Sequence, residues 1–208
     1  MKLQLPKIYP LTDVKLSGLS HSQQVERLIA GGSRFIQLRE KDATPADFFE
    51  NVRHSMEIAS GTETTIIVND RVDIALATKA HGVHLGQDDL PVTAARGLLG
   101  DDAIIGLSTH NIDQAAEAIK LPVNYIAFGP IFPTSTKKDH DPVVGLDLLR
   151  QIRERIGDFP LVAIGGINSS NLAETLANGA DSVALISELF VEIDNISGQF
   201  GRLNVFAT

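Results

Sequence analysis

Charged and amide side chains suited to binding a metal diphosphate follow three successive apolar runs of the chain. Five such residues stand just beyond these runs: Arg39, Lys41, Asn69, Asp70 and Asp89. If the runs are neighbouring parallel strands, their carboxyl ends meet, and two carboxylates can offer oxygen ligands to one hard cation. Magnesium takes one or two protein carboxylates together with water and substrate phosphate oxygens. The set therefore predicts a Mg²⁺-bound diphosphate, whereas helix capping by the aspartates and an Arg39–Asp70 ion pair are the alternative readings.

A second group of residues suggests a separate phosphate site. The sequence VAIGGINSSN ends an apolar run at Gly165 and Gly166, and Asn168 to Ser170 are natural caps for a helix that follows. Glycines let a phosphate approach the backbone closely, and many barrels bind phosphate with the loops after their last two strands. Gly166, Ile186 and Ser187 are thus candidates for binding one phosphate monoester. The alternative is a paired-glycine turn with a capping serine.

The stretch FGPIFPTSTKKDHDPVVG, residues 128–145, is a long polar loop in an otherwise economical chain. Two phosphate sites imply two phosphorylated small molecules or one long bisphosphorylated substrate. We expect Thr134 and Thr136 to face one ligand and Lys137 the other. A flexible solvated loop is the alternative reading.

The elements that must position these residues alternate regularly along the chain. Short apolar runs predict eight strands: 8–11, 35–38, 65–68, 82–85, 104–107, 125–128, 161–164 and 183–186. Helical periodicity lies between them, as where Thr44 precedes Pro45 in a helix start. Eight such units in one domain predict a single α/β domain over residues 1–208, a (β/α)8 TIM barrel, with an open doubly wound sheet as the alternative. Active sites of such barrels lie at the carboxyl ends of the strands, where all the polar residues above fall.

Bulk composition narrows the class of protein. The formal charge of −8 argues against nucleic-acid or anionic-membrane partners, which need a basic surface. The absence of cysteine excludes disulfides and thiolate metal sites. No apolar run reaches the roughly 18 residues that span a bilayer, and Met1 to Pro10 lacks the apolar centre of a signal peptide. We expect a cytoplasmic protein that acts on small molecules; homo-oligomer formation is left open.

Eight motifs from Tyr9 to Ser187 resemble thiamine-phosphate synthases in order and spacing: YPLTD, QLREK, VNDRVDIAL, GVHLGQDDLP, IGLSTHN, YIAFGPIFPTSTKKD, VAIGGIN and DSVALIS. The resemblance implies a transferase of thiamine biosynthesis that condenses hydroxymethylpyrimidine diphosphate with a thiazole phosphate. Whether the thiazole carries a carboxylate is left open. The family mechanism is dissociative: diphosphate leaves first, and the thiazole nitrogen captures the pyrimidine-methyl cation.

The resemblance also implies a role for each matched residue. Residues implied to bind the pyrimidine diphosphate are Gln37, Leu38, Arg39, Glu40, Lys41, Asn69, Ser108 and Lys137. Arg39, Lys41 and Lys137 are the catalytic cations, and Asp70 and Asp89 hold magnesium. Residues implied to bind the thiazole phosphate are Thr134, Ser135, Thr136, Gly166, Ile186 and Ser187.

Two other functions remain as alternatives. Thiazole tautomerases are a related barrel family with a histidine in a sequence similar to that around His110, and a noncatalytic binding protein for thiamine-pathway phosphates is the third reading. His84 falls within a predicted strand and is interpreted as structural. After Ser187 the chain departs from the family, and its two glycines predict a short or irregular final helix.

Overall fold

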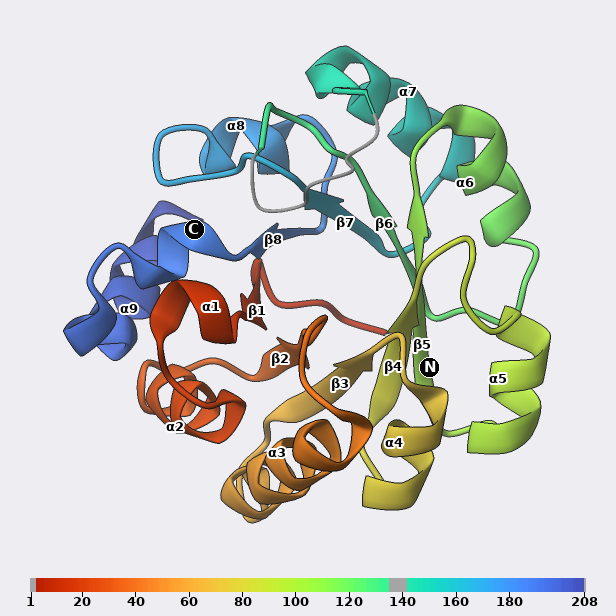
Figure 1. The fold of residues 1–208 in the computed structure, drawn as a ribbon. Helices are drawn as coiled ribbons and strands as arrows, with labels where there is room; N and C mark the ends of the chain where they lie inside the picture. The colour runs from red at the N-terminus through yellow and green to blue at the C-terminus, as the bar shows by residue number, and fades with distance from the viewer. Residues whose placement is uncertain (1–2, 135–141, 208) are drawn as a thin grey trace.

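The computed structural model describes residues 3–134 and 142–207 and shows a closed barrel of eight parallel strands in chain order (Figure 1). The strands are β1 (Ile8–Thr12), β2 (Phe35–Leu38), β3 (Thr65–Asn69), β4 (Gly82–Leu85), β5 (Ile104–Thr109), β6 (Tyr125–Phe128), β7 (Leu161–Ile164) and β8 (Ser182–Leu185). β8 pairs with β1, for example at Val183 and Ile8, which closes the sheet. The predicted barrel is confirmed, and the open doubly wound sheet is wrong.

Helices surround the barrel, as Figure 1 shows. They are α1 (Val14–Ser17), α2 (His21–Ala30), α3 (Pro45–Ala59), α4 (Val72–Thr78), α5 (Val92–Leu99), α6 (Ile112–Ala118), α7 (Gly145–Ile156), α8 (Leu172–Ala177) and α9 (Ile196–Phe206), with 3-10 turns η1 (Ser187–Phe190) and η2 (Ile193–Asn195) before the last. The predicted start of α3 is confirmed, because the Thr44 side chain accepts a hydrogen bond from the amide of Asp47 and Pro45 occupies the first turn.

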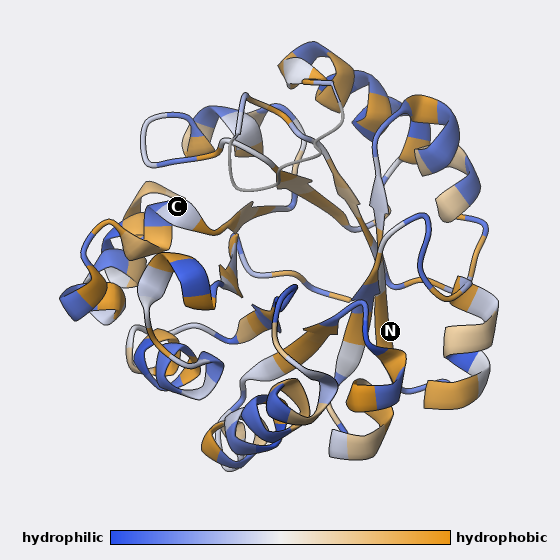
Figure 2. Cartoon of the chain, viewed as in Figure 1, coloured by the Kyte–Doolittle hydropathy of each residue, from blue (hydrophilic) through white to orange (hydrophobic). Residues whose placement is uncertain are grey.

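The core has two layers, since successive strand residues point to opposite faces. Side chains such as Tyr9, Phe35 and Tyr125 fill the barrel interior. Ile8, Ile36 and their counterparts on the other strands pack outward against the helices. In Figure 2 the helices carry both orange apolar and blue polar residues. Full burial of one Ile or Phe side chain contributes roughly 1.5–3 kcal/mol, so this two-sided packing makes the barrel a rigid support for the loops at its ends.

The expectation of a short or irregular final helix is wrong. Although η1 and η2 are irregular, α9 runs for 11 residues and buries Ile196, Phe200 and Leu203. Its start explains one of the two glycines: the Asn195 side chain accepts a hydrogen bond from the Gly198 amide, and a Cβ at Gly198 would lie 2.3 Å from Asn195 Oδ1. Tertiary packing therefore overrides low helix propensity here.

Within the described ranges, no helix combines the length and apolar character needed to cross a membrane.

Candidate active site at the carboxyl ends of the strands

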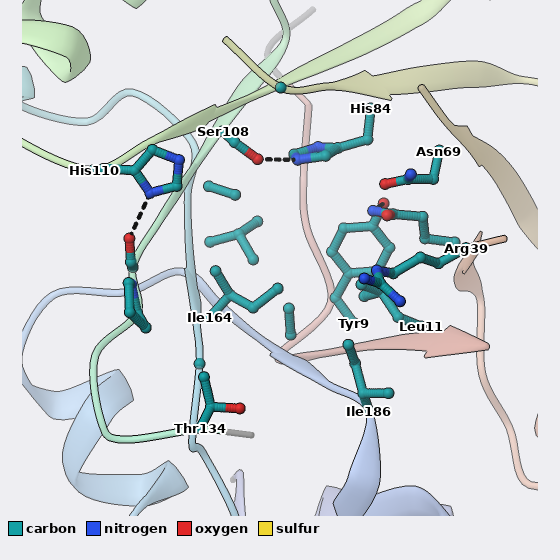
Figure 3. Close-up of a pocket in the computed structure, with 18 of the residues that line it drawn as sticks. Tyr9, Leu11, Arg39, Asn69, His84, Ser108, His110, Thr134, Ile164 and Ile186 are labelled. Carbon is teal, nitrogen blue, oxygen red and sulfur yellow. Dashed lines mark hydrogen bonds between the residues drawn. The ribbon is translucent and has the colours of Figure 1, made fainter. Parts of the chain in front are cut away.

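A cavity of about 580 Å³ opens at the carboxyl ends of the strands, and every one of the eight strands contributes to its wall. Eleven residues predicted from the sequence to belong to the site line it: Gln37, Arg39, Lys41, Asn69, Asp70, Asp89, Ser108, Thr134, Gly166, Ile186 and Ser187. Figure 3 shows Arg39 and Asn69 on one side of this cavity and Thr134 on another. The barrel thus brings the two predicted phosphate groups into one space.

Ion pairs and hydrogen bonds hold the side chains of the proposed diphosphate and magnesium site. Lys41 Nζ forms an ion pair with Asp70, and Asp89 Oδ2 accepts a hydrogen bond of 2.6 Å from the amide of Gly86. Arg39 lies 3.6 Å from Asp13, so the alternative Arg39–Asp70 ion pair is wrong. These contacts keep Lys41 beside the Asp70 carboxylate, hold Asp89 against its own turn and place Arg39 near Asp13.

The two aspartates do not cap the helices that follow them. α4 begins at Val72 after Arg71 and α5 at Val92 after Pro91, and neither start has a side-chain cap. Asp70 instead adopts a left-handed backbone conformation with φ of 60°. An aspartate tolerates this region better than most residues, and such conformations occur often at functional sites.

The electrostatics of the pair suit a bound cation. Burial raises the pKa of Asp89, and the nearby negative charge of Asp70 raises it further, against the opposing effect of the Gly86 amide. A divalent cation between them would remove this repulsion. No cluster of three or more His, Cys, Asp or Glu side chains suited to a metal occurs among residues 3–134 and 142–207. Two carboxylates match the small protein share that magnesium takes beside a phosphate substrate.

Two residues of the QLREK motif lie outside the cavity wall. Leu38 is fully buried in the core. Glu40 faces its own loop, where Oε1 accepts hydrogen bonds from the amides of Lys41 (2.7 Å), Asp42 (2.8 Å) and Ala43 (3.2 Å). Its Oε2 lies 3.1 Å from Nε2 of the buried His21. Burial raises the pKa of Glu40, but these hydrogen bonds outweigh burial, and its pKa is lowered. Glu40 therefore shapes the loop that carries Arg39 and Lys41.

The cavity floor is a chain of hydrogen bonds. Gln37 Nε2 donates to the Tyr9 hydroxyl at 2.9 Å, which lies 2.9 Å from the Tyr125 hydroxyl. The Tyr125 hydroxyl is 3.0 Å from His84 Nδ1, and His84 Nε2 is 2.9 Å from Ser108 Oγ (Figure 3). Burial lowers the pKa of His84 to about 4 and raises the pKa of both tyrosines, so all three are uncharged at neutral pH.

Asn69 presents a buried donor without a partner. Its Nδ2 is buried, and no described residue accepts a hydrogen bond from it. A buried polar group left unpaired costs about 1–3 kcal/mol, so a ligand with an acceptor at this position would bind with that penalty removed.

The opposite wall is built from backbone. Gly165 and Gly166 have φ of 99° and 65°, and a Cβ on Gly166 would lie 2.5 Å from the carbonyl oxygen of Pro133. The second glycine is therefore required by the close approach of the loop after β6. Asn171 immediately precedes α8 and makes no side-chain cap. Of the predicted caps, Asn168 does hold the turn before this helix: its Oδ1 accepts a hydrogen bond of 2.9 Å from the Ser170 amide, and its carbonyl oxygen accepts one of 3.0 Å from the Leu172 amide.

Three residues predicted for the site lie outside the described residues: Ser135, Thr136 and Lys137. His110 lines the cavity, and its Nδ1 lies 2.8 Å from the carbonyl oxygen of Gly129.

Comparisons with known proteins agree with this geometry. The family model described as "Thiamine monophosphate synthase" matches residues 8–189. The chain belongs to the thiamine monophosphate synthase family. A thiamine-phosphate synthase of Clostridium novyi is 44% identical over 92% of this chain and 94% of its own length, and one of Chloroflexus aurantiacus is 40% identical over 97% and 93%. The solved thiamine phosphate pyrophosphorylase of Pyrococcus furiosus superposes with a TM-score of 0.86 at 33% identity, covering 97% of this chain and 95% of that one.

Sequence reasoning missed part of the site of this thiamine monophosphate synthase family member. Tyr9 and His84 line the cavity, and Tyr125 supports them from below. A signal was present: the chain has two tyrosines, and both fall in predicted strands. A phenol buried inside a barrel needs a hydrogen-bond partner for its hydroxyl, so a polar chain through the interior was to be expected.

Proposed function

We propose that this protein is a thiamine-phosphate synthase, a transferase that joins hydroxymethylpyrimidine diphosphate to a thiazole phosphate and releases diphosphate. The observation that carries this proposal is the single cavity, which has Arg39, Lys41 and a carboxylate pair on one side and the backbone of Gly166 with Ser187 on another. One cavity of this kind can hold two phosphorylated molecules with their reacting ends together. The family membership supports this choice of reaction.

The diphosphate side of the cavity would promote departure of the leaving group. The C–O bond between the pyrimidine methylene and diphosphate breaks, and its electron pair leaves with diphosphate. Arg39 and Lys41 would neutralise the charge that develops on the departing oxygens, and Asn69 Nδ2 would donate a hydrogen bond to the substrate. A preorganised donor in such a site lowers the activation free energy by about 2.7–4 kcal/mol. The aminopyrimidine stabilises the resulting cation by its own electron density.

Asp70 and Asp89 are the residues that would hold magnesium. The ion, when bound, supplies positive charge to the diphosphate oxygens. The mutual repulsion of the two carboxylates supports this assignment, because a cation between them would offset it.

The thiazole side would fix the second substrate by its phosphate. Thr134, Ser135, Thr136, Gly166, Ile186 and Ser187 are the proposed contacts, and Lys137 would complete the diphosphate site. With its phosphate held, the thiazole nitrogen donates its lone pair to the methylene carbon and forms the C–N bond. This step transfers no proton, so no general base is assigned.

The test is a reaction with purified protein, both substrates and MgCl₂, in which thiamine phosphate and released diphosphate are measured together. We expect both products in equal amounts. Arg39→Ala should lower kcat/KM about 100-fold or more, whereas Arg34→Ala, which removes an exposed arginine paired with Glu63, should leave it unchanged. Conversion of thiazole tautomers without condensation would indicate a tautomerase, and binding without turnover would indicate a binding protein. Either result would overturn the proposal.

A further inference from the structure

The hydrogen-bond chain beneath the cavity crosses the whole barrel interior. Its members are Gln37 on β2, Tyr9 on β1, Tyr125 on β6, His84 on β4 and Ser108 on β5. Gln37, Tyr9, His84 and Ser108 line the cavity, and Tyr125 joins Tyr9 to His84 from below. Each link is 2.9–3.0 Å long, which is ordinary hydrogen-bond length.

The chain is held firmly in place. The imidazole of His84 stacks on the Tyr125 ring at a centroid distance of 5.5 Å, and the Tyr9 ring meets the Tyr125 ring edge to face at 6.0 Å. Gly106 leaves the space for this contact, because a Cβ there would lie 2.4 Å from the Tyr125 hydroxyl and 2.6 Å from His84 Nδ1. A side chain at residue 106 would therefore collide with the middle of the chain.

Donors and acceptors in this chain can be arranged in only two complete ways. Each hydroxyl has one hydrogen to donate, and a neutral imidazole has one donating and one accepting nitrogen. With Gln37 Nε2 donating to Tyr9, every hydrogen has an acceptor only if Tyr9 donates to Tyr125, Tyr125 donates to His84 Nδ1, and His84 Nε2 donates to Ser108. Turning the Gln37 amide over reverses every link and makes Ser108 the donor to His84.

The direction of donation along this hydrogen-bond chain decides which donors and acceptors face a ligand in the cavity. With Gln37 Nε2 donating to Tyr9, Gln37 Oε1 receives no hydrogen bond from a described residue, and the Ser108 hydroxyl keeps its own hydrogen for the cavity. The Gln37 end therefore accepts while the Ser108 end donates. In the reversed sense, Gln37 would donate, and the Ser108 hydrogen would be used inside the protein.

We propose that Tyr9, Tyr125 and His84 are positioning residues that couple the orientation of the Gln37 amide to that of the Ser108 hydroxyl, and so select an aminopyrimidine over an oxopyrimidine. An exocyclic amino group donates to Gln37 Oε1, while Ser108 donates to an acceptor of the same pyrimidine diphosphate. An oxo group in the same place would need the amide turned over, and the coupled chain would then withdraw the Ser108 donor. A site with matched buried polar groups rejects a mismatched analogue because one of those groups is left unpaired. This inference rests on the proposed function for the identity of the substrate.

The first test measures the tautomer of His84 in the intact protein. ¹⁵N-labelled histidine side chains are observed by NMR at neutral pH. The protein has six histidines, and the His84 signals are those that disappear in His84→Gln. We expect a neutral ring with the proton on Nε2. A proton on Nδ1, or on both nitrogens, would overturn the relay.

The second test compares binding of the 4-amino and 4-oxo forms of the pyrimidine diphosphate by calorimetry. We expect the preference of the native protein for the amino form to fall about tenfold in Tyr125→Phe, and similarly in Tyr9→Phe, because either change lets the Gln37 amide turn over independently. Thr64→Val is the matched control, since it removes another buried hydroxyl, one that donates to the Ser33 carbonyl at 3.0 Å away from the chain. The control should keep the native preference.

Each outcome bears on one claim. An unchanged preference in both tyrosine variants, or an equal fall in Thr64→Val, would overturn the coupling. If the protein makes thiamine phosphate but His84 carries its proton on Nδ1, the coupling between Gln37 and Ser108 is refuted and the proposed function stands. If His84 carries its proton on Nε2 and the protein prefers the amino form but does not condense the substrates, the coupling stands and the proposed function is refuted. Failure to bind either pyrimidine diphosphate would overturn the selection of the substrate.

Discussion

Asp89→Asn separates the electrostatic role of the carboxylate from its structural role. An asparagine Oδ1 can still accept the hydrogen bond from the Gly86 amide, so the local turn is retained. The substitution removes a partly buried negative charge. Burial and the neighbouring charge of Asp70 both raise the pKa of Asp89 in the native protein. A carboxylate with a raised folded pKa opposes folding at neutral pH, because the folded state disfavours its charged form. In metal-free buffer we therefore expect the free energy of unfolding to stay equal or to rise.

The effect should invert when magnesium and inorganic diphosphate are added. At ligand concentrations about 100 times the dissociation constant, binding stabilises the folded state by about 2.7 kcal/mol. For a chain of this size, about 2–4 °C accompanies each kcal/mol, so the native protein should gain about 5–10 °C in melting temperature. If the loss of one ligand weakens binding about 100-fold, the variant gains only about 0.4 kcal/mol at the same concentrations, or about 1 °C.

Differential scanning fluorimetry with and without magnesium diphosphate measures both quantities. Asp101→Asn is the matched control, because it removes an exposed aspartate near the start of β5, away from the cavity. The control should show the full native shift. An equal ligand shift in Asp89→Asn, or a loss of more than about 2 kcal/mol in metal-free buffer, would refute the assignment of Asp89 to the cation.

Three further changes test other parts of the site. Glu40→Ala removes the acceptor of three loop amides and should lower kcat/KM about 10–100-fold in steady-state assays, with Glu40→Gln closer to native. Equal kcat/KM in the native protein and both variants would show that the loop keeps its conformation without the Glu40 carboxylate. Gly166→Ala places a Cβ 2.5 Å from the Pro133 carbonyl oxygen and should cost about 2–4 kcal/mol in urea denaturation, against about 1 kcal/mol for Gly61→Ala, which has positive φ but open space; equal costs would exclude the steric argument. The pKa of His84 falls from 6.5 to about 4 on folding, so the unfolded state binds more protons, and the free energy of unfolding should drop by up to about 3 kcal/mol as pH falls through that window. Urea titrations from pH 7 to pH 4 should show a smaller drop in His84→Gln, and an identical drop would contradict the role of His84.

Most of the barrel could be predicted from the sequence because its signals are local. The apolar runs of 35–38, 82–85, 125–128 and 161–164 match strands residue for residue. The helix start at Thr44 was readable from one side chain and the proline after it. Such signals depend only on residues close together in the sequence, so they can be recognised before the fold is known. The final helix was misjudged because Ile196, Phe200 and Leu203 gain their stability from burial against the rest of the molecule.

The site itself divides in the same way. Cations, carboxylates and paired glycines can be recognised by residue type and by their position after a strand. For this reason the sequence was enough to predict Arg39, Asp70, Asp89 and Gly166 as site residues. The direction of a side chain cannot be read from its position. Glu40 belongs to the same motif as Arg39, yet its carboxylate turns back to bind its own loop.

The sequence alone determined the alternation of strands and helices, the end of the barrel that carries chemistry, and the kinds of charge gathered there. Each follows from local periodicity and from the rule that the carboxyl ends of parallel strands meet. Tertiary structure alone decided which groups touch: Lys41 pairs with Asp70, Arg39 lies near Asp13, and Tyr9 meets Tyr125 across 116 residues of chain. The physical reason is that closing the barrel sets distances between residues remote in sequence, and hydrogen bonds and ion pairs depend on those distances to within a few tenths of an ångström.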